Sequence, residues 1–138
     1  MYQVDDETYD VQLLPLGPVS TTVWLSKRAA DELTDFIDRD KTTGARFLKK
    51  LKEWAKAGFA NFEGGDGFPI KHEGDGVFRV GMRSSLFRLL GFYNNGKGEF
   101  IVIDAVLKRG LPLSSSDRKR ITEVARVKRV GCWRRILK

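Results

Sequence analysis

The chain has 138 residues, of which 41% are hydrophobic and 31% charged, and this size and composition suit one compact domain with its own core. Its net charge of +7 favours nucleic acid or another anionic partner. The single cysteine, Cys132, excludes an intrachain disulfide, and with neither a signal-peptide pattern nor an apolar run of about 20 residues we expect a cytoplasmic protein without a membrane segment.

The N-terminal part predicts a strand followed by a helix. Residues 1–18 form a mixed segment, which we interpret as an extension that is either an added strand or an arm. Residues 19–25 are rich in β-branched and aromatic side chains and predict a strand. Ser26 can cap a helix over residues 27–39, whose apolar residues recur at helical spacing and whose exposed side is acidic.

A second helix is predicted after a short turn, so that the two helices form a hairpin. Thr42 or Thr43 can cap it, and Gly58 is a plausible αL terminator. The apolar stripe between them consists of Phe47, Leu48, Leu51, Trp54 and Ala55, which we expect in the core. Residues 61–67 are rich in glycine and acidic residues and predict a loop.

The second half of the chain predicts three antiparallel strands and a final helix. Apolar runs at residues 77–83, 86–93 and 100–107 are separated by turn-forming residues, which indicates a β-meander. Ser114 to Asp117 resembles a capping box for a helix ending near residue 129. The expected fold class is therefore α+β, with an extension at 1–18, one domain at 19–129 and a basic tail at 130–138.

Positive charge is concentrated on the predicted sheet. Residues 1–70 carry 9 Lys and Arg against 12 Asp and Glu, whereas residues 71–138 carry 16 against 6. Alternation in the first run predicts that Arg79 and Arg83 leave the same face of a strand. Arg88 follows in the next run, and Lys108 and Arg109 close the third. Acidic residues are absent from 77–98, so we interpret these cations as a site for a polyanion.

The segment 78–90, Phe-Arg-Val-Gly-Met-Arg-Ser-Ser-Leu-Phe-Arg-Leu-Leu, resembles the central strands of the RelE/ParE superfamily of bacterial toxins. The resemblance covers roughly residues 19–129, including the helical hairpin, the turn at 70–76 and residues 103–109, and it is nearest the RelE and HigB-like branches. It implies a RelE-like microbial RNase-type fold. It also implies ribosome-dependent cleavage of mRNA in the A site and control by a cognate antitoxin that covers the basic sheet.

Cleavage of RNA through its own 2′-OH requires loss of that proton, stabilisation of a dianionic phosphorane and protonation of the departing 5′ oxygen. By the resemblance, Arg88 stabilises the phosphate, Arg79 is the catalytic basic residue of the preceding strand, and Arg109 assists from the last strand. The residues expected to contact the RNA are Arg83, Lys108, Lys71, Arg118 and Lys119.

Three departures leave the general base open. Gly81 stands where a RelE-type enzyme would present a lysine, Phe87 replaces a tyrosine, and the residues after Arg109 include no tyrosine. Arginine is a poor base because its pKa exceeds about 12. His72, the only imidazole, is a possible general base, although its place before the turn also suits a surface residue. We expect no metal and no cofactor, since one His and one Cys make no zinc set.

Two other hypotheses stay open at this point. The first is a ParE-like protein that inhibits a topoisomerase without cutting RNA. The second is a catalytically inactive domain that only binds RNA or a partner protein.

Overall fold

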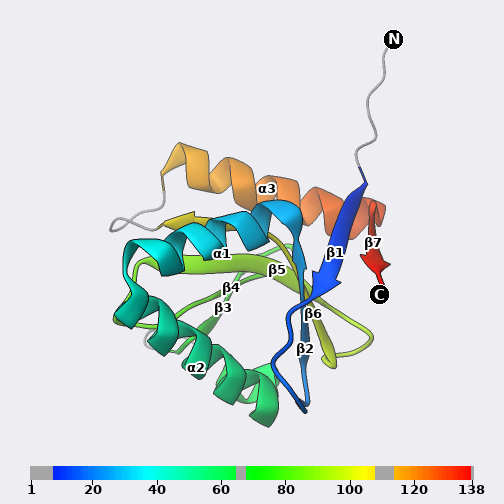
Figure 1. Cartoon of the computed structure of the whole chain (residues 1–138). Helices are drawn as coiled ribbons and strands as arrows, with labels where there is room; N and C mark the ends of the chain where they lie inside the picture. The colour runs from blue at the N-terminus through cyan, green and yellow to red at the C-terminus, as the bar shows by residue number, and fades with distance from the viewer. Residues whose placement is uncertain (1–7, 65–67, 108–113, 138) are drawn as a thin grey trace.

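The computed structural model describes residues 8–64, 68–107 and 114–137. Its elements are the strands β1 (Tyr9–Leu13), β2 (Thr22–Ser26), β3 (Ile70–Gly74), β4 (Val77–Val80), β5 (Phe87–Asn94), β6 (Glu99–Leu107) and β7 (Trp133–Ile136), the α-helices α1 (Lys27–Arg39), α2 (Lys41–Ala57) and α3 (Ser115–Val130), and the 3-10 helix η1 (Phe59–Phe62). The strands form one sheet, which confirms the predicted α+β class (Figure 1).

The sheet has seven strands in the order β3-β4-β5-β6-β2-β1-β7. Strands β3 to β6 are antiparallel neighbours, whereas β2 runs parallel to β6 and β7 runs parallel to β1. The three predicted strands pair antiparallel as β4, β5 and β6, but they are part of a larger mixed sheet, so a simple meander does not describe the fold. Residues 70–74 form a strand rather than a turn because Ile70 is fully buried and pairs with Val80, and both ends of the chain add strands to the opposite edge.

The two chain ends meet at that edge. β1 lies within the predicted extension and β7 within the predicted tail, and Tyr9 of β1 is registered against Trp133 of β7. The Trp133 ring packs edge-on against Phe92, 5.9 Å away between centroids. Figure 1 shows β1 and β7 side by side beyond β2.

The helical hairpin forms as predicted, with corrections at its caps. Helix α1 spans residues 27–39, and the Ser26 hydroxyl accepts the Ala29 N–H at 3.0 Å. Helix α2 is capped by Asp40, whose carboxylate accepts the Thr43 N–H at 3.0 Å, so Thr42 and Thr43 are not its caps. Gly58 ends α2 with φ 101° and ψ 121°, which lies outside the predicted αL region.

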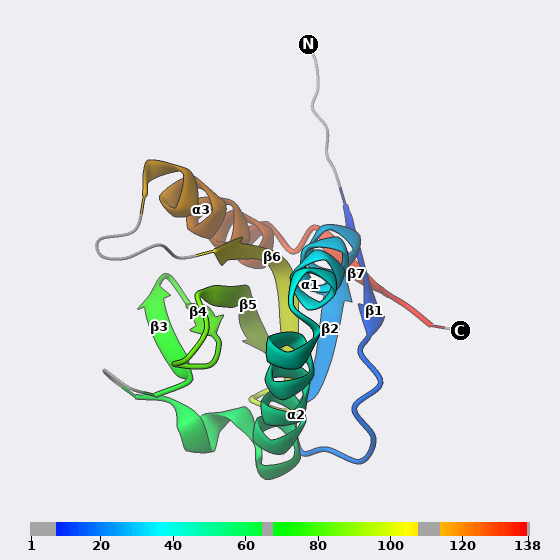
Figure 2. The ribbon, with the colours of Figure 1, turned by 60° about the vertical axis from the view of Figure 1, so that its left-hand side comes forward.

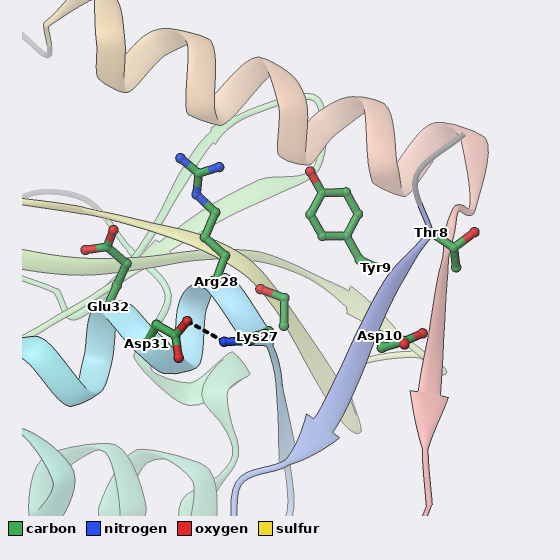
Figure 3. A pocket seen from close by; sticks show the side chains of 8 residues that line it. Thr8, Tyr9, Asp10, Lys27, Arg28, Asp31 and Glu32 are labelled. Atoms are coloured by element: carbon green, nitrogen blue, oxygen red, sulfur yellow. Dashed lines mark hydrogen bonds and ion pairs between the residues drawn. The ribbon is translucent and has the colours of Figure 1, made fainter. Parts of the chain in front are cut away.

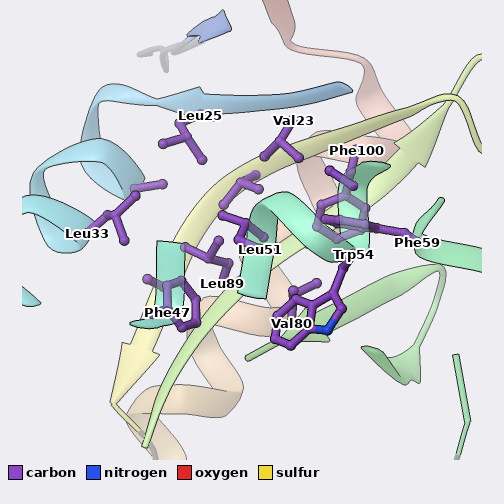
Figure 4. Close-up of a cluster of buried hydrophobic side chains, with 14 of the residues drawn as sticks. Val23, Leu25, Leu33, Phe47, Leu51, Trp54, Phe59, Val80, Leu89 and Phe100 are labelled. Atoms are coloured by element: carbon purple, nitrogen blue, oxygen red, sulfur yellow. The ribbon is translucent and has the colours of Figure 1, made fainter. Parts of the chain in front are cut away.

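The hairpin packs on one face of the sheet. Figure 4 shows Phe47, Leu51 and Trp54 of α2 among the strand residues Leu89 and Phe100, and all are buried. The predicted placement of these three α2 side chains in the core is thereby confirmed. The ring of Phe87 lies in this cluster as well, stacked on Phe36 with 4.5 Å between centroids.

Helix α3 packs on the other face of the sheet. Val124 and Val127 are buried against Val77 and Leu90 of the strands. The Ser114 hydroxyl accepts the Asp117 N–H at 3.0 Å, which confirms the predicted N-cap. Figure 2 shows α3 separated from α1 and α2 by the sheet. Within the described ranges, no helix has the length and apolar character required to traverse a bilayer.

Candidate nucleic-acid interface

Arg79 and Arg88 lie on neighbouring strands, on the face of the sheet that α3 covers. Strand β4 pairs with β5 so that Arg79 is opposite Leu90, whose side chain belongs to the α3 cluster. Opposite residues of an antiparallel pair share a face, and residues two apart on one strand share it too. Arg88, two residues before Leu90, therefore faces the same side as Arg79.

The side chain of Arg79 is only 7% exposed and forms an ion pair with Glu73, with 2.7 Å between Nε and Oε2. Glu73 has no partner in the register of β3 and β4, which shifts between His72 and Gly74. Such a bulge re-aims a side chain, and here it turns the Glu73 carboxylate toward Arg79. Arg79 Nη1 is buried and has no hydrogen-bond partner among the described residues, so its donor capacity is not exhausted.

Arg88 is half-buried, and its Nη1 donates to the backbone carbonyls of Ser85 and Phe87, the latter at 2.9 Å. No carboxylate of the described residues forms an ion pair with it. Burial lowers the pKa of the Arg88 guanidinium, and the charge of Arg79 lowers it further. A partly desolvated cation without an acidic partner is an unfavourable arrangement that a bound anion would relieve.

Gly81 creates the space in which Arg88 lies. A Cβ at position 81 would be 2.5 Å from Arg88 Cδ and 2.5 Å from the Phe87 carbonyl oxygen. Any larger residue would therefore displace the Arg88 side chain or the backbone of β5. The absence of a side chain at Gly81 and the placement of Arg88 are thus linked sterically, because a lysine at position 81 is incompatible with this placement.

Lys71 and His72 lie on opposite faces of the β3–β4 hairpin. Lys71 is registered against Arg79 and so faces α3, half-buried. His72 packs against the Phe78 ring at 4.8 Å between centroids, and its Nε2 accepts the Gly76 N–H at 3.2 Å. Phe78 packs against the α1–α2 cluster. The proposed general base His72 is therefore not brought together with Arg79 and Arg88.

Arg83 does not share a strand face with Arg79, and that expectation is wrong. Strand β4 ends at Val80, and Arg83 is exposed in the connection to β5. There it lines a hollow of about 400 Å³ together with Arg46 and Lys50 of α2. The alternation read from the sequence fails because strand β4 ends three residues before Arg83, which itself lies in a turn.

The remaining predicted contacts fall into two groups. Arg118 and Lys119 are exposed in the first turn of α3, the helix that covers the Arg79 face. Lys108 and Arg109 lie outside the described residues. The structure therefore places Arg79, Arg88 and Lys71 of the predicted set on one face of the sheet, and it adds Glu73, which sequence reasoning missed.

A second buried carboxylate, Asp104 of β6, also faces α3. Its Oδ1 lies 3.2 Å from Arg28 Nε and 3.0 Å from Arg120 Nη1. The register between β5 and β6 shifts at Gly91, leaving Ile103 as the extra residue, so Asp104 is turned to the α3 side. A glycine inside a strand often marks such a bulge, so Gly91 was the sequence signal for this one. In the structure, a Cβ at position 91 would meet the Ile101 oxygen at 2.2 Å.

A hollow of about 600 Å³ beside the start of α1 does not suit an anion. Its cations are already paired, Lys27 with Asp31 at 2.9 Å (Figure 3) and Arg28 with Asp104. Asp10 and Glu32 add negative charge to its wall. In the part of the chain that the structure describes, no group of three metal-ligating side chains comes together.

Comparisons with known protein families, with curated proteins and with solved structures give no match for this chain. The function of the α3 face is therefore inferred from the chemistry of its side chains alone. It consists of an uncompensated guanidinium at Arg88, a buried guanidinium at Arg79 with an unused donor, an ammonium at Lys71 and a carboxylate at Glu73. These are the groups that binding and transforming a phosphodiester require.

Proposed function

We propose that this chain is a RelE-like toxin that binds mRNA in the ribosomal A site and cleaves it, and that a cognate antitoxin restrains it. The observation that carries the proposal is the half-buried guanidinium of Arg88, which has no acidic partner among the described residues and lies beside a second arginine. A phosphate bound there would supply the missing negative charge.

In the proposed reaction, Arg88 donates hydrogen bonds to the non-bridging phosphate oxygens. Charge on these oxygens increases as the 2′ oxygen attacks phosphorus, so the donors act most strongly in the transition state. The products are a 2′,3′-cyclic phosphate and a 5′-hydroxyl end. The unused Nη1 of Arg79 can join this interaction once the RNA is bound.

Proton transfer is assigned to Glu73 and Lys71. Glu73 is the carboxylate on the α3 face of the hairpin, and it accepts the 2′-OH proton in place of His72, which faces the other side. Lys71 is the ammonium on the same face as Arg79 and gives a proton to the departing 5′ oxygen. Arg79 is then a positioning residue, because its ion pair fixes the direction of the Glu73 carboxylate.

A ParE-like, non-nucleolytic inhibitor is the second candidate function, and the same ion pair favours it. Arg79 and Glu73 are already paired with each other, with 2.7 Å between Nε and Oε2. This pairing leaves the described α3 face of the hairpin without a free carboxylate. This candidate predicts inhibition of gyrase supercoiling by the purified protein, with no change in mRNA. The first candidate predicts cut mRNA and unaffected supercoiling.

Purified protein added to translating ribosomes with end-labelled mRNA tests the proposal. We expect codon-phased cuts that disappear with Arg88→Ala and persist with Arg129→Ala, an exposed arginine on α3. Unchanged cutting by Arg88→Ala would sink the assignment. An intact mRNA together with salt-sensitive RNA binding and no growth arrest on expression would instead identify an inactive RNA-binding domain.

A further inference from the structure

Helix α2 carries a dense row of cations on the opposite side of the sheet from Arg88. Its exposed side chains include the six cations Lys41, Arg46, Lys49, Lys50, Lys52 and Lys56, against one acid, Glu53. Residues 1–70 as a whole carry a net negative charge, so the net charge of this half of the chain does not reveal the cations of α2.

Most of these cations have no acidic partner. Lys50 lies 3.9 Å from Glu53, and Lys41 lies 3.9 Å from Asp38. The other four, Arg46, Lys49, Lys52 and Lys56, form no ion pair within the described ranges. Like charges three and four residues apart on a helix destabilise it slightly. Repulsion between the unpaired cations therefore does not stabilise the folded chain, which is consistent with a role in binding.

One end of the row borders the hollow that contains Arg83. The hollow has a volume of about 400 Å³. Its lining combines the cations Arg46, Lys50 and Arg83 with the apolar side chains of Trp54, Phe62, Pro69 and Met82. Cations beside an apolar and aromatic surface are the combination that single-stranded nucleic acid requires, since phosphates take the cations and bases take the apolar surface. The hollow is therefore suited to an unpaired base.

We propose that α2 and this hollow form a second RNA-binding surface, which holds single-stranded RNA outside the Arg88 site. Phosphates lie along α2, and one base enters the hollow beneath Arg83. The inference shares with the proposed function only the assumption that the ligand is RNA. Arg83 lies in the connection of residues 81–86 that leads directly to β5 and Arg88, so the same strand of RNA can pass from one surface to the other.

The row is longer than a short acidic peptide motif needs. Arg46 and Lys56 are ten residues apart, which corresponds to about 15 Å along a helix. A polyanion with regularly repeated charge matches such a row, whereas an acidic protein segment would need carboxylates at several matching positions. The apolar floor beside the row adds a place for a base, which a purely electrostatic contact would not use.

The test is RNA binding by a variant in which Lys49, Lys52 and Lys56 are changed to Gln. The matched control changes Lys27, Arg129 and Arg134 to Gln, which removes the same charge from exposed positions elsewhere. Fluorescence anisotropy of a labelled oligouridine, titrated at several KCl concentrations, gives the affinity and its salt dependence. Circular dichroism confirms that both variants are folded.

We expect the α2 variant to bind at least about tenfold more weakly and its salt slope to fall by about 2, since each phosphate contact to a single strand contributes roughly 0.7. The control should lose much less affinity. Equal losses in the two variants would overturn the proposal, because net charge alone would then explain binding. Displacement of the RNA by polyglutamate of equal charge at the same concentration would also overturn it, in favour of an acidic protein partner.

The outcome is separable from the proposed function. If the α2 variant binds RNA like the wild type while Arg88→Ala abolishes cleavage, the second surface is wrong and the function stands. If the wild type cuts no RNA but the α2 variant still loses affinity and the control does not, the surface stands without the reaction.

Discussion

The charges on the two faces of the sheet differ in how they are solvated and paired. On the α3 face, Arg79 and Asp104 are buried, and each has an oppositely charged partner. On the other face, the cations of α2 are exposed, and most of them lack a partner. Arg88 belongs to neither pattern, since it is half-buried and has no acidic partner in the described residues.

This difference separates charges that hold the fold together from charges that are available to a ligand. A buried charge is costly unless it is paired, so removing its partner should reduce stability. An exposed and unpaired charge contributes little to stability, so removing it should affect binding alone. Measurements of stability and of RNA binding therefore test this distinction separately.

The largest loss of stability is expected for Asp104→Ala. The substitution leaves Arg120 and Arg28 without the carboxylate that both contact. It removes one link between α3 and β6, while the hydrogen bond from Arg120 to the Ala105 carbonyl stays. We expect the free energy of unfolding to fall by about 4 kcal/mol, since breaking a buried pair has this cost. Urea denaturation measures it, and Asp31→Ala, which breaks the exposed pair with Lys27, should cost less than about 0.5 kcal/mol.

Glu73→Leu should cost somewhat less, about 3 kcal/mol, because it leaves Arg79 buried and unpaired. The double variant with Arg79→Met should recover most of that loss, since apolar side chains can replace a buried ion pair at little cost. The same denaturation experiment decides this. A double variant less stable than Glu73→Leu alone would show that Arg79 contributes more than its charge pair.

Gly81→Ala should cost about 1–2 kcal/mol, as overpacking usually does. The new methyl group would meet the Phe87 carbonyl oxygen and the Arg88 side chain at 2.5 Å, so Arg88 must move. We therefore expect weaker RNA binding together with the loss of stability. Gly98→Ala, in a turn where a Cβ would lie 3.5 Å from the Asn95 carbonyl oxygen, is the control for the general effect of losing a glycine. RNA affinity that is unaltered by Gly81→Ala would contradict the link between Gly81 and Arg88.

Stability should also decrease in acid. Hydrogen bonds from Arg126 lower the pKa of Glu123 below its ordinary value of 4.5. Burial raises the pKa of Glu99, but hydrogen bonds from Arg135 and Asn94 outweigh it and lower the net value. Groups with a lowered folded pKa stabilise the protein above their unfolded pKa and lose this contribution as pH falls through the folded value. Thermal unfolding from pH 6 down to about pH 3 should show the decline, and Glu123→Gln should make it shallower.

The smallest effect on stability is expected for the triple substitution of Lys49, Lys52 and Lys56 by Gln. These side chains are exposed and unpaired, and Gln has nearly the same helix propensity as Lys. We expect a change within about 0.5 kcal/mol in urea denaturation. A larger loss would mean that the α2 row supports the fold, which would remove the distinction between the two faces.

Much of the fold could be predicted from the sequence, because its signals are local. Ser26 and Ser114 cap helices, and the apolar stripe of α2 enters the core as its spacing indicated. A strand in residues 1–18 was one of two alternatives, and the structure has it as β1, paired with the nearby β2. Strand β7 could not be predicted, since it pairs with residues of β1 more than 100 positions away in sequence. Such pairing leaves no local pattern when the strands are short.

The candidate site was predictable in part, for a related reason. The arginines were visible as residue types, and two of them do share a face. Their surroundings were not visible, because the bulges at Glu73 and Ile103 change which side chains face α3. Alternation also placed Arg83 beside Arg79, because the sequence does not show that β4 ends at Val80, and it gave no indication that Glu73 would pair with Arg79.

The most direct test of the account compares mRNA cleavage on translating ribosomes by the wild type, Arg88→Lys and Arg88→Ala. Lysine keeps the positive charge but loses the planar fork that can hold two phosphate oxygens. We expect codon-phased cleavage that is reduced by Arg88→Lys and abolished by Arg88→Ala, with all three proteins folded. Cleavage at the wild-type rate by Arg88→Ala would contradict it.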